Sequence, residues 1–125
     1  MDAKETRRLH ELAAKAVGLS DDYRYCEVWK CMAVWNDTDG GWFDWRSTWR
    51  PFADDGDSRR LEVALEMNVY INDRYCIAEI LSDGDEPPVH KKEYCNCSTK
   101  AAATRLAVLR AAAAIGEAMQ ERGAA

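Results

Sequence analysis

The sequence predicts a single α+β domain over residues 1–125, in which helices pack against an antiparallel sheet of three to five strands. Apolar residues recur at helical spacing near both ends of the chain, and central segments alternate between apolar and polar residues as strands do. Turn-forming residues separate these segments, which gives the order α–β–(β)–α–β–β–β–α. Helices segregated in this way from a mostly antiparallel sheet are typical of an α+β sandwich.

The chain opens with a predicted helix over residues 2–17, and Gly18 follows as a stop signal. Its apolar face consists of Leu9, Leu12, Ala13, Ala16 and Val17. His10 falls on the side of this helix, where we expect it to be solvated. Residues 23–35 alternate and predict one strand. The stretch that follows predicts a turn, and residues 42–45 predict a short strand or an ordered loop.

The middle of the chain predicts a second helix, from Asp57 to about Asn68, followed by two strands within residues 68–81. The two strands are joined at Asn72-Asp73, because Asn and Asp tolerate the left-handed backbone of a tight turn.

The last part of the chain predicts one more strand and a long helix. The strand covers residues 89–97, and its consecutive lysines favour a position at the edge of the sheet. Ser98 is expected to cap the helix, which runs to about Glu121. One face of this helix carries small side chains that would allow close helix–helix contact in a homodimer: Ala103, Ala107, Ala111 and Ala114.

The charge balance argues against a general nucleic-acid binder. The chain has 17 basic and 22 acidic residues, so its net charge is -5. Nucleic-acid binding usually needs a basic surface. No stretch approaches the roughly 18 consecutive apolar residues of a membrane span, and the charged N-terminus lacks the apolar core of a signal peptide. We therefore expect a cytoplasmic protein without a membrane partner.

The cysteines are expected to be reduced and free of metal, because cytosolic thiols stay reduced and their number is odd. They are Cys26, Cys31, Cys76, Cys95 and Cys97. A metal site built from His90, Cys95 and Cys97 is the alternative, but a closed zinc site needs a fourth ligand. Cys76 is the one remaining donor that could serve, and nothing in the spacing requires it. No cofactor is expected.

The acidic run Asp54-Asp55-Gly56-Asp57 precedes the second helix and is most simply a helix start. A calcium loop fails here, because arginines would occupy the fifth and sixth loop positions. Instead, Asp55 or Asp57 is expected to cap the free amides of the helix, where negative charge also suits the helix dipole. A contact with a divalent ion or a partner is the alternative.

Four tryptophans and two arginines alternate within a short stretch of the chain: Trp35, Trp42, Trp45, Arg46, Trp49 and Arg50. One interpretation is that the tryptophans cover the core. Trp and Arg are also the residues enriched in binding hot spots, which favours an interaction surface. Rings interleaved with arginines can stack a base, so a small-ligand pocket is the third reading.

Arg105 falls inside the apolar arc of the last helix. A guanidinium at the edge of a core needs an anionic partner, and we expect Asp54, Asp55 or Asp57, with an external anion or solvent as alternatives.

Enzyme signatures are missing: the sequence has no glycine-rich phosphate loop, no Gly-x-Ser-x-Gly and no HExxH.

Two segments carry a resemblance to a known family. "WRPFADDGDSRRLEVALEMNV" and "STKAAATRLAVLRAAAAIGEAM" resemble, in this order and at this distance, small phage and prophage proteins of the phage ABA-sandwich kind. Residues 9–18 are similar to the opening of the same family. The resemblance implies a phage or prophage origin and an α/β/α layered domain. It implies no reaction and no catalytic residue.

Two hypotheses about function follow. The first is a non-enzymatic phage protein that binds and inhibits or modulates a host protein, as anti-defence and anti-CRISPR proteins do, with an exposed patch and no deep pocket. The second is a small-ligand binder, such as a sponge for a nucleotide signal, with a concave site lined by Trp and Arg. For both, the expected site residues are Trp42, Trp45, Arg46, Trp49 and Arg50, with Asp54, Asp55, Asp57 and Arg105 as secondary candidates.

Overall fold

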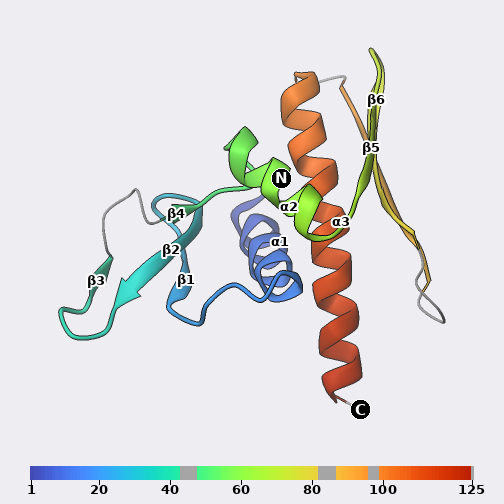
Figure 1. Ribbon diagram of the computed structural model, residues 1–125. Coiled ribbons are helices and arrows are strands. Elements are labelled where there is room, and N and C mark those ends of the chain that lie inside the picture. The colour runs from blue at the N-terminus through green and yellow to red at the C-terminus, as the bar shows by residue number, and fades with distance from the viewer. Residues whose placement is uncertain (43–47, 82–86, 96–98, 125) are drawn as a thin grey trace.

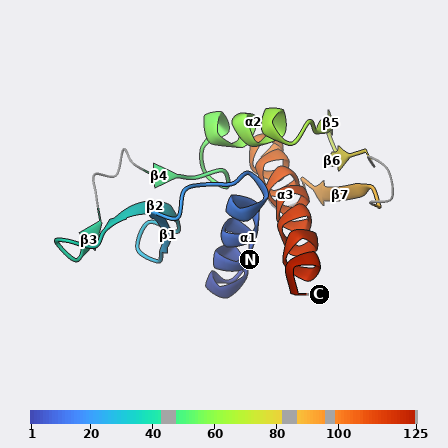
Figure 2. The same cartoon turned by 60° about the horizontal axis from the view of Figure 1, so that its bottom comes forward.

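Helix α3 (Lys100–Ala124) forms the centre of the molecule (Figure 1). The computed structural model describes residues 1–42, 48–81, 87–95 and 99–124. Helices α1 (Ala3–Ala16) and α2 (Asp55–Ala64) pack on one side of α3, and a three-stranded sheet packs on its other side. A second, small sheet lies beyond α1, as Figure 2 also shows. The predicted α+β sandwich is confirmed, but its strands form two sheets.

Helix α1 is confirmed and lies one residue inside the predicted range of 2–17 at each end. The carboxylate of Asp2 accepts a hydrogen bond from the Glu5 amide at 2.7 Å, which satisfies one free amide of the first turn. Gly18 adopts the left-handed backbone (φ 66°) that stops a helix. His10, predicted to be solvated, is fully buried. Its Nδ1–H donates to the Thr6 carbonyl at 2.7 Å, and the rings of Tyr25 and Phe52 lie beside it.

Helix α2 begins two residues earlier than predicted and ends at Ala64, before the predicted end near Asn68, which lies in a strand; its cap also differs. The N-cap is Asp54, whose Oδ2 accepts the Asp57 amide at 2.8 Å, so the prediction that Asp55 or Asp57 caps the helix was wrong. For α3, the Thr99 hydroxyl accepts the Ala102 amide at 3.0 Å. The predicted cap, Ser98, lies outside the described residues.

The predicted single strand over residues 23–35 is a hairpin instead. Strands β1 (Tyr23–Cys26) and β2 (Cys31–Asn36) pair antiparallel, with Cys26 opposite Cys31, and residues 27–30 form the turn. Two short strands extend this sheet: β3 (Gly41–Trp42) pairs with the end of β2, and β4 (Thr48–Trp49) pairs with its start. The turn predicted after residue 36 is confirmed.

The three-stranded sheet has the predicted meander. Strands β5 (Asn68–Ile71), β6 (Tyr75–Ile80) and β7 (Val89–Tyr94) are antiparallel in this order. The predicted tight turn forms because Oδ1 of Asn72 accepts the amides of Arg74 and Tyr75, at 2.9 and 3.0 Å. The edge position predicted for the lysine-rich strand is confirmed, since β7 pairs with β6 alone among the described strands.

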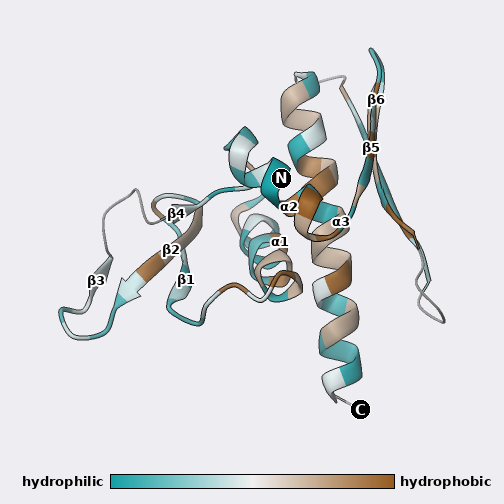
Figure 3. Cartoon of the chain, in the orientation of Figure 1, coloured by the Kyte–Doolittle hydropathy of each residue, from teal (hydrophilic) through white to brown (hydrophobic). Residues whose placement is uncertain are grey.

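The core lies along α3, whose apolar and small residues are visible in Figure 3. Gly116 lets α1 approach closely, because a Cβ atom at this position would stand 1.9 Å from the carbonyl oxygen of Leu12. The alanines expected to serve a homodimer are used inside the chain: Ala103, Ala107 and Ala111 are at most 2% exposed. No helix in the described part of the chain is long and apolar enough to cross a membrane.

Candidate functional site

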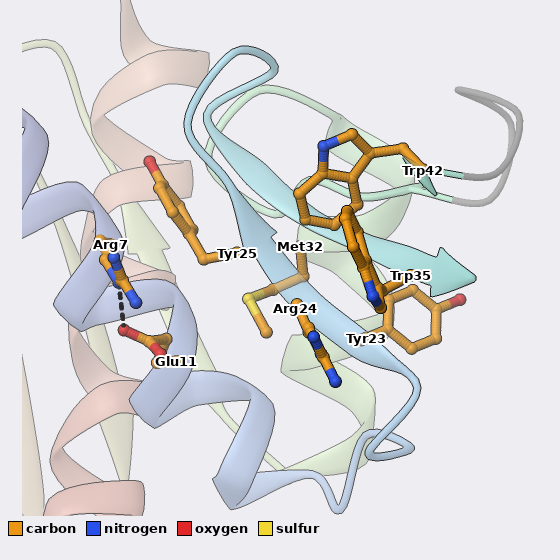
Figure 4. A pocket seen from close by; sticks show the side chains of 8 residues that line it. All are labelled: Arg7, Glu11, Tyr23, Arg24, Tyr25, Met32, Trp35 and Trp42. Carbon is orange, nitrogen blue, oxygen red and sulfur yellow. Dashed lines mark hydrogen bonds and ion pairs between the residues drawn. The ribbon is translucent and has the colours of Figure 1, made fainter. Parts of the chain in front are cut away.

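A cavity of about 370 Å³ lies between α1 and the strands β1–β3. Figure 4 shows charged side chains of α1 on one side and the aromatic side chains of the small sheet on the other. We call this cavity the Trp–Arg groove. It is lined by Arg7, Glu11, Tyr23, Arg24, Tyr25, Met32, Trp35 and Trp42.

The aromatic wall of the groove is a cross-strand tryptophan pair. Trp35 on β2 stands opposite Trp42 on β3, and their rings meet edge to face with centroids 4.9 Å apart. Such pairs are favourable because the positive ring edge meets the negative ring face. Trp29, in the turn between β1 and β2, lies 6.4 Å from Trp42 and is 37% exposed. The three indoles therefore form one continuous, partly exposed surface.

Two arginines border the groove and lie over its rings. The guanidinium of Arg24 is 5.6 Å from the centre of the Trp35 ring and forms an ion pair with Asp37 at 3.2 Å. The guanidinium of Arg7 is 6.0 Å from the Tyr25 ring and pairs with Glu11 at 3.0 Å. Arg7 also pairs with Glu27 at 3.6 Å, and each guanidinium has five N–H donors, so donors remain for other contacts.

The floor of the groove is joined to the buried part of the molecule. Met32 is 6% exposed, and the Tyr25 ring lies 5.9 Å from the ring of buried His10. Burial and the nearby Cys31 thiol raise the pKa of Tyr25, so its hydroxyl is protonated and can donate at neutral pH. The groove thus has one wall on a helix of the core and one on the small sheet.

The structure brings together only some of the residues expected to form a site. Trp42 lines the groove, whereas Trp45 and Arg46 lie outside the described residues. Trp49 packs against the core cluster. Arg50 is half-buried, and its amide donates to Oδ2 of Asp57 at 2.9 Å. Neither residue is among those that line the groove.

Several groove residues were not expected from the sequence: Arg7, Glu11, Tyr23, Arg24 and Tyr25. The first two sit on the polar face of a helix, which normally indicates exposure to solvent. The other three were assigned to a single strand. Only the hairpin and its packing beside α1 reveal that these side chains share a cavity.

The acidic run serves the start of α2. Besides the cap formed by Asp54, Asp57 accepts hydrogen bonds from the Arg50 amide and, at 2.6 Å, from the guanidinium of Arg60. Asp55 is paired with Arg105 at 2.6 Å, so the expected internal partner of this arginine is confirmed. Arg105 Nε also donates to the Phe52 carbonyl at 2.9 Å, which ties α3 to the segment before α2.

The described cysteines are free thiols: Cys26, Cys31, Cys76 and Cys95. Burial, with the neighbouring Cys26 as a smaller cause, raises the pKa of Cys31 to about 11. Within the described ranges, no three His, Cys, Asp or Glu side chains are placed to hold a metal ion. Cys97, the third member of the alternative metal site, lies outside the described residues.

No protein-family model, curated protein or solved structure matches this chain. The fold and the site alone therefore define its class. It is an α+β protein with a concave surface of tryptophans and arginines at the junction of a helix and a small sheet.

Proposed function

We propose that this protein is a non-enzymatic binding protein that engages a partner protein through the Trp–Arg groove. The observation that carries the proposal is the continuity of the groove with exposed apolar side chains of the β1–β2 turn. Trp29 adjoins the tryptophan pair, and Val28 beside it is 84% exposed. Exposed apolar side chains next to Trp and Arg are characteristic of interaction surfaces rather than of free protein surface.

The composition of the groove suits a binding hot spot. Trp, Tyr and Arg carry most of the binding energy in protein interfaces, because they bury large areas and add directed donors. Here the Arg24 guanidinium lies 5.6 Å from the centre of the Trp35 ring, so the cation and the ring are presented together on one surface.

The resemblance to phage ABA-sandwich proteins supports a partner from a bacterial host. On this proposal the protein acts in the host cytoplasm and inhibits or modulates a host protein, such as a component of a defence system, including CRISPR effectors. The acidic net charge of -5 is compatible with a basic, nucleic-acid-handling partner.

The test is affinity capture of the full chain from the host, followed by binding measurements on variants. Trp42→Ala and Arg24→Ala are expected to weaken binding by about thirtyfold each, which corresponds to about 2 kcal/mol. Arg59→Ala is the matched control for Arg24→Ala, because Arg59 also forms an exposed ion pair, at 3.0 Å with Glu62, but lies on α2. Groove variants that fold normally and bind as well as the unmodified chain would refute the proposal.

A small planar ligand is the second candidate, and the concavity itself favours it. A volume of about 370 Å³ falls in the range of small-molecule sites, roughly 300–1,000 Å³. A ring stacked on Trp42 would place an attached anionic group near Arg24 or Arg7. Native mass spectrometry separates the two candidates: a stoichiometric host protein supports the first, and a small molecule released on denaturation supports the second.

A further inference from the structure

The three-stranded sheet has one face that none of the described helices covers. Strands β5–β7 bury one face against α3, and in Figures 1 and 2 the opposite face is directed away from the rest of the molecule. Because side chains alternate along a strand, the register assigns eight residues to the uncovered face. They are Asn68, Tyr70, Tyr75, Ile77, Glu79, His90, Lys92 and Tyr94, which we call the open face.

The open face is apolar at its centre. Ile77 on the middle strand stands between Tyr70 and Lys92, and Tyr75 stands opposite Tyr94 in the next row. Tyr70 on the edge strand β5 and Tyr94 on the edge strand β7 are 56% and 58% exposed, so the open face carries a large exposed ring on each side of its middle strand.

The charges of the open face are self-complementary. Glu79 forms no ion pair with another described residue, and Lys92 contacts two rings, with Nζ 3.9 Å from the centre of Tyr75 and 5.2 Å from that of Tyr94. A twofold axis that lies in the interface midway between Glu79 and Lys92 would bring each Lys92 toward the Glu79 of the other copy. Because a twofold axis repeats every contact, the Lys92–Glu79 ion pair would form twice in such an isologous interface.

We propose that the open face is the interface of a homodimer in which two β5–β7 sheets pack face to face. Aligned packing of two sheets is a standard way to bury an apolar sheet face. Pairing through the β7 edge is disfavoured, since that edge strand carries Lys91 and Lys92. The dimer leaves the Trp–Arg groove free, because that groove lies beyond α1, on the other side of α3.

Single-stranded nucleic acid is the other occupant to consider for a tyrosine-rich sheet, since bases stack on exposed rings. Two observations oppose it. The ammonium of Lys92 already lies over the ring faces of Tyr75 and Tyr94, and the net charge of the chain is -5.

The experiment is sedimentation velocity of the full chain from low micromolar to near-millimolar concentration. We expect a concentration-dependent dimer. Tyr70→Glu should weaken it at least about tenfold. Val63→Glu is the matched control, because Val63 on α2 is 63% exposed and undergoes the same change of charge away from the sheet. Trp42→Ala, which removes a groove residue, should leave the dimer unchanged.

A charge exchange tests the pairing itself. Lys92→Glu and Glu79→Lys should each weaken the dimer about tenfold, since each gives the face charges of one sign, and the double variant should recover most of the loss. Circular dichroism is the check that each variant folds. Four results would overturn the proposal. The chain stays monomeric at all concentrations, or the dimer is as strong with Tyr70→Glu as without it. Alternatively, the double variant does not restore the dimer lost in the single variants, or the chain binds oligonucleotides in a way that requires Tyr70 and Tyr94.

Discussion

Gly116→Ala offers the sharpest test of the packing between α1 and α3. The added Cβ atom would lie 1.9 Å from the backbone oxygen of Leu12, whereas ordinary van der Waals contact begins near 3.4 Å. The shortfall of about 1.5 Å falls on backbone rather than on the end of a flexible side chain. The two helices must therefore separate where Leu9, Leu12 and Leu109 are buried.

The expected size of the effect combines two opposing contributions. Overpacking a core typically costs about 1–3 kcal/mol, and a clash with backbone belongs at or above the upper end. Replacing a helical glycine by alanine returns about 1 kcal/mol through helix propensity. We expect a net loss of about 2 kcal/mol or more, which corresponds to a melting temperature lower by roughly 6–10 °C.

The assay is urea and thermal unfolding followed by circular dichroism, with Gly123→Ala as the matched control. Gly123 lies in the same helix, and a Cβ atom there meets nothing within 4 Å. That variant should be as stable as the unmodified chain or slightly more stable, by less than about 1 kcal/mol. If Gly116→Ala behaved like Gly123→Ala, the close crossing of α1 and α3 would be wrong.

Four further predictions follow from single contacts. Burial lowers the pKa of His10, so the unfolded state takes up the proton first and stability should fall as pH drops below about 6.5. In His10→Phe, the free energy of unfolding measured by urea titration at each pH should lack this decrease. Asp54→Ala should lose about 1 kcal/mol of stability in thermal unfolding, while Asp54→Asn retains the cap. Asp55→Ala should cost at most about 1 kcal/mol, since Asp55 is 77% exposed; a larger loss in the same assay would contradict a simple ion pair with Arg105. Cys31, with a pKa near 11 and 1% exposure, should resist alkylation in the folded protein and react in urea, and intact mass should show no bound metal or disulfide.

The helices could be predicted from the sequence because their periodicity and end signals agree. Asp2 and Gly18 mark α1 as capping rules require, and Asn72 marks the β5–β6 turn. The hairpin of β1 and β2 was missed because its turn has no such signal. Residues 27–30 read Glu-Val-Trp-Lys, and the left-handed position is taken by Lys30 (φ 53°), where a glycine or asparagine would have indicated a turn.

The candidate site was predicted only in part, because it depends on tertiary structure. The cluster of tryptophans pointed to Trp42, but the same cluster also includes Trp49, which packs on the core. The spacing in the sequence cannot show which tryptophan lines the groove and which packs on the core, since Trp42 and Trp49 both follow short polar stretches. Arg7 and Glu11 join the site only because the hairpin folds beside α1. His10 was misplaced for the same reason, as the rings that bury it come from β1 and from Phe52.

The position of α1 between the core and the groove decides which substitutions can test binding. Its inner face carries Leu9 and Leu12 into the core, while Arg7 and Glu11 on the outer face line the groove. Tyr25 contacts buried His10 as well as the groove, so replacing it disturbs stability and binding together. Trp42 and Arg24 lie on the small sheet, away from the core cluster along α3. Loss of binding at these two positions, with an unchanged melting temperature, can therefore be attributed to the groove itself.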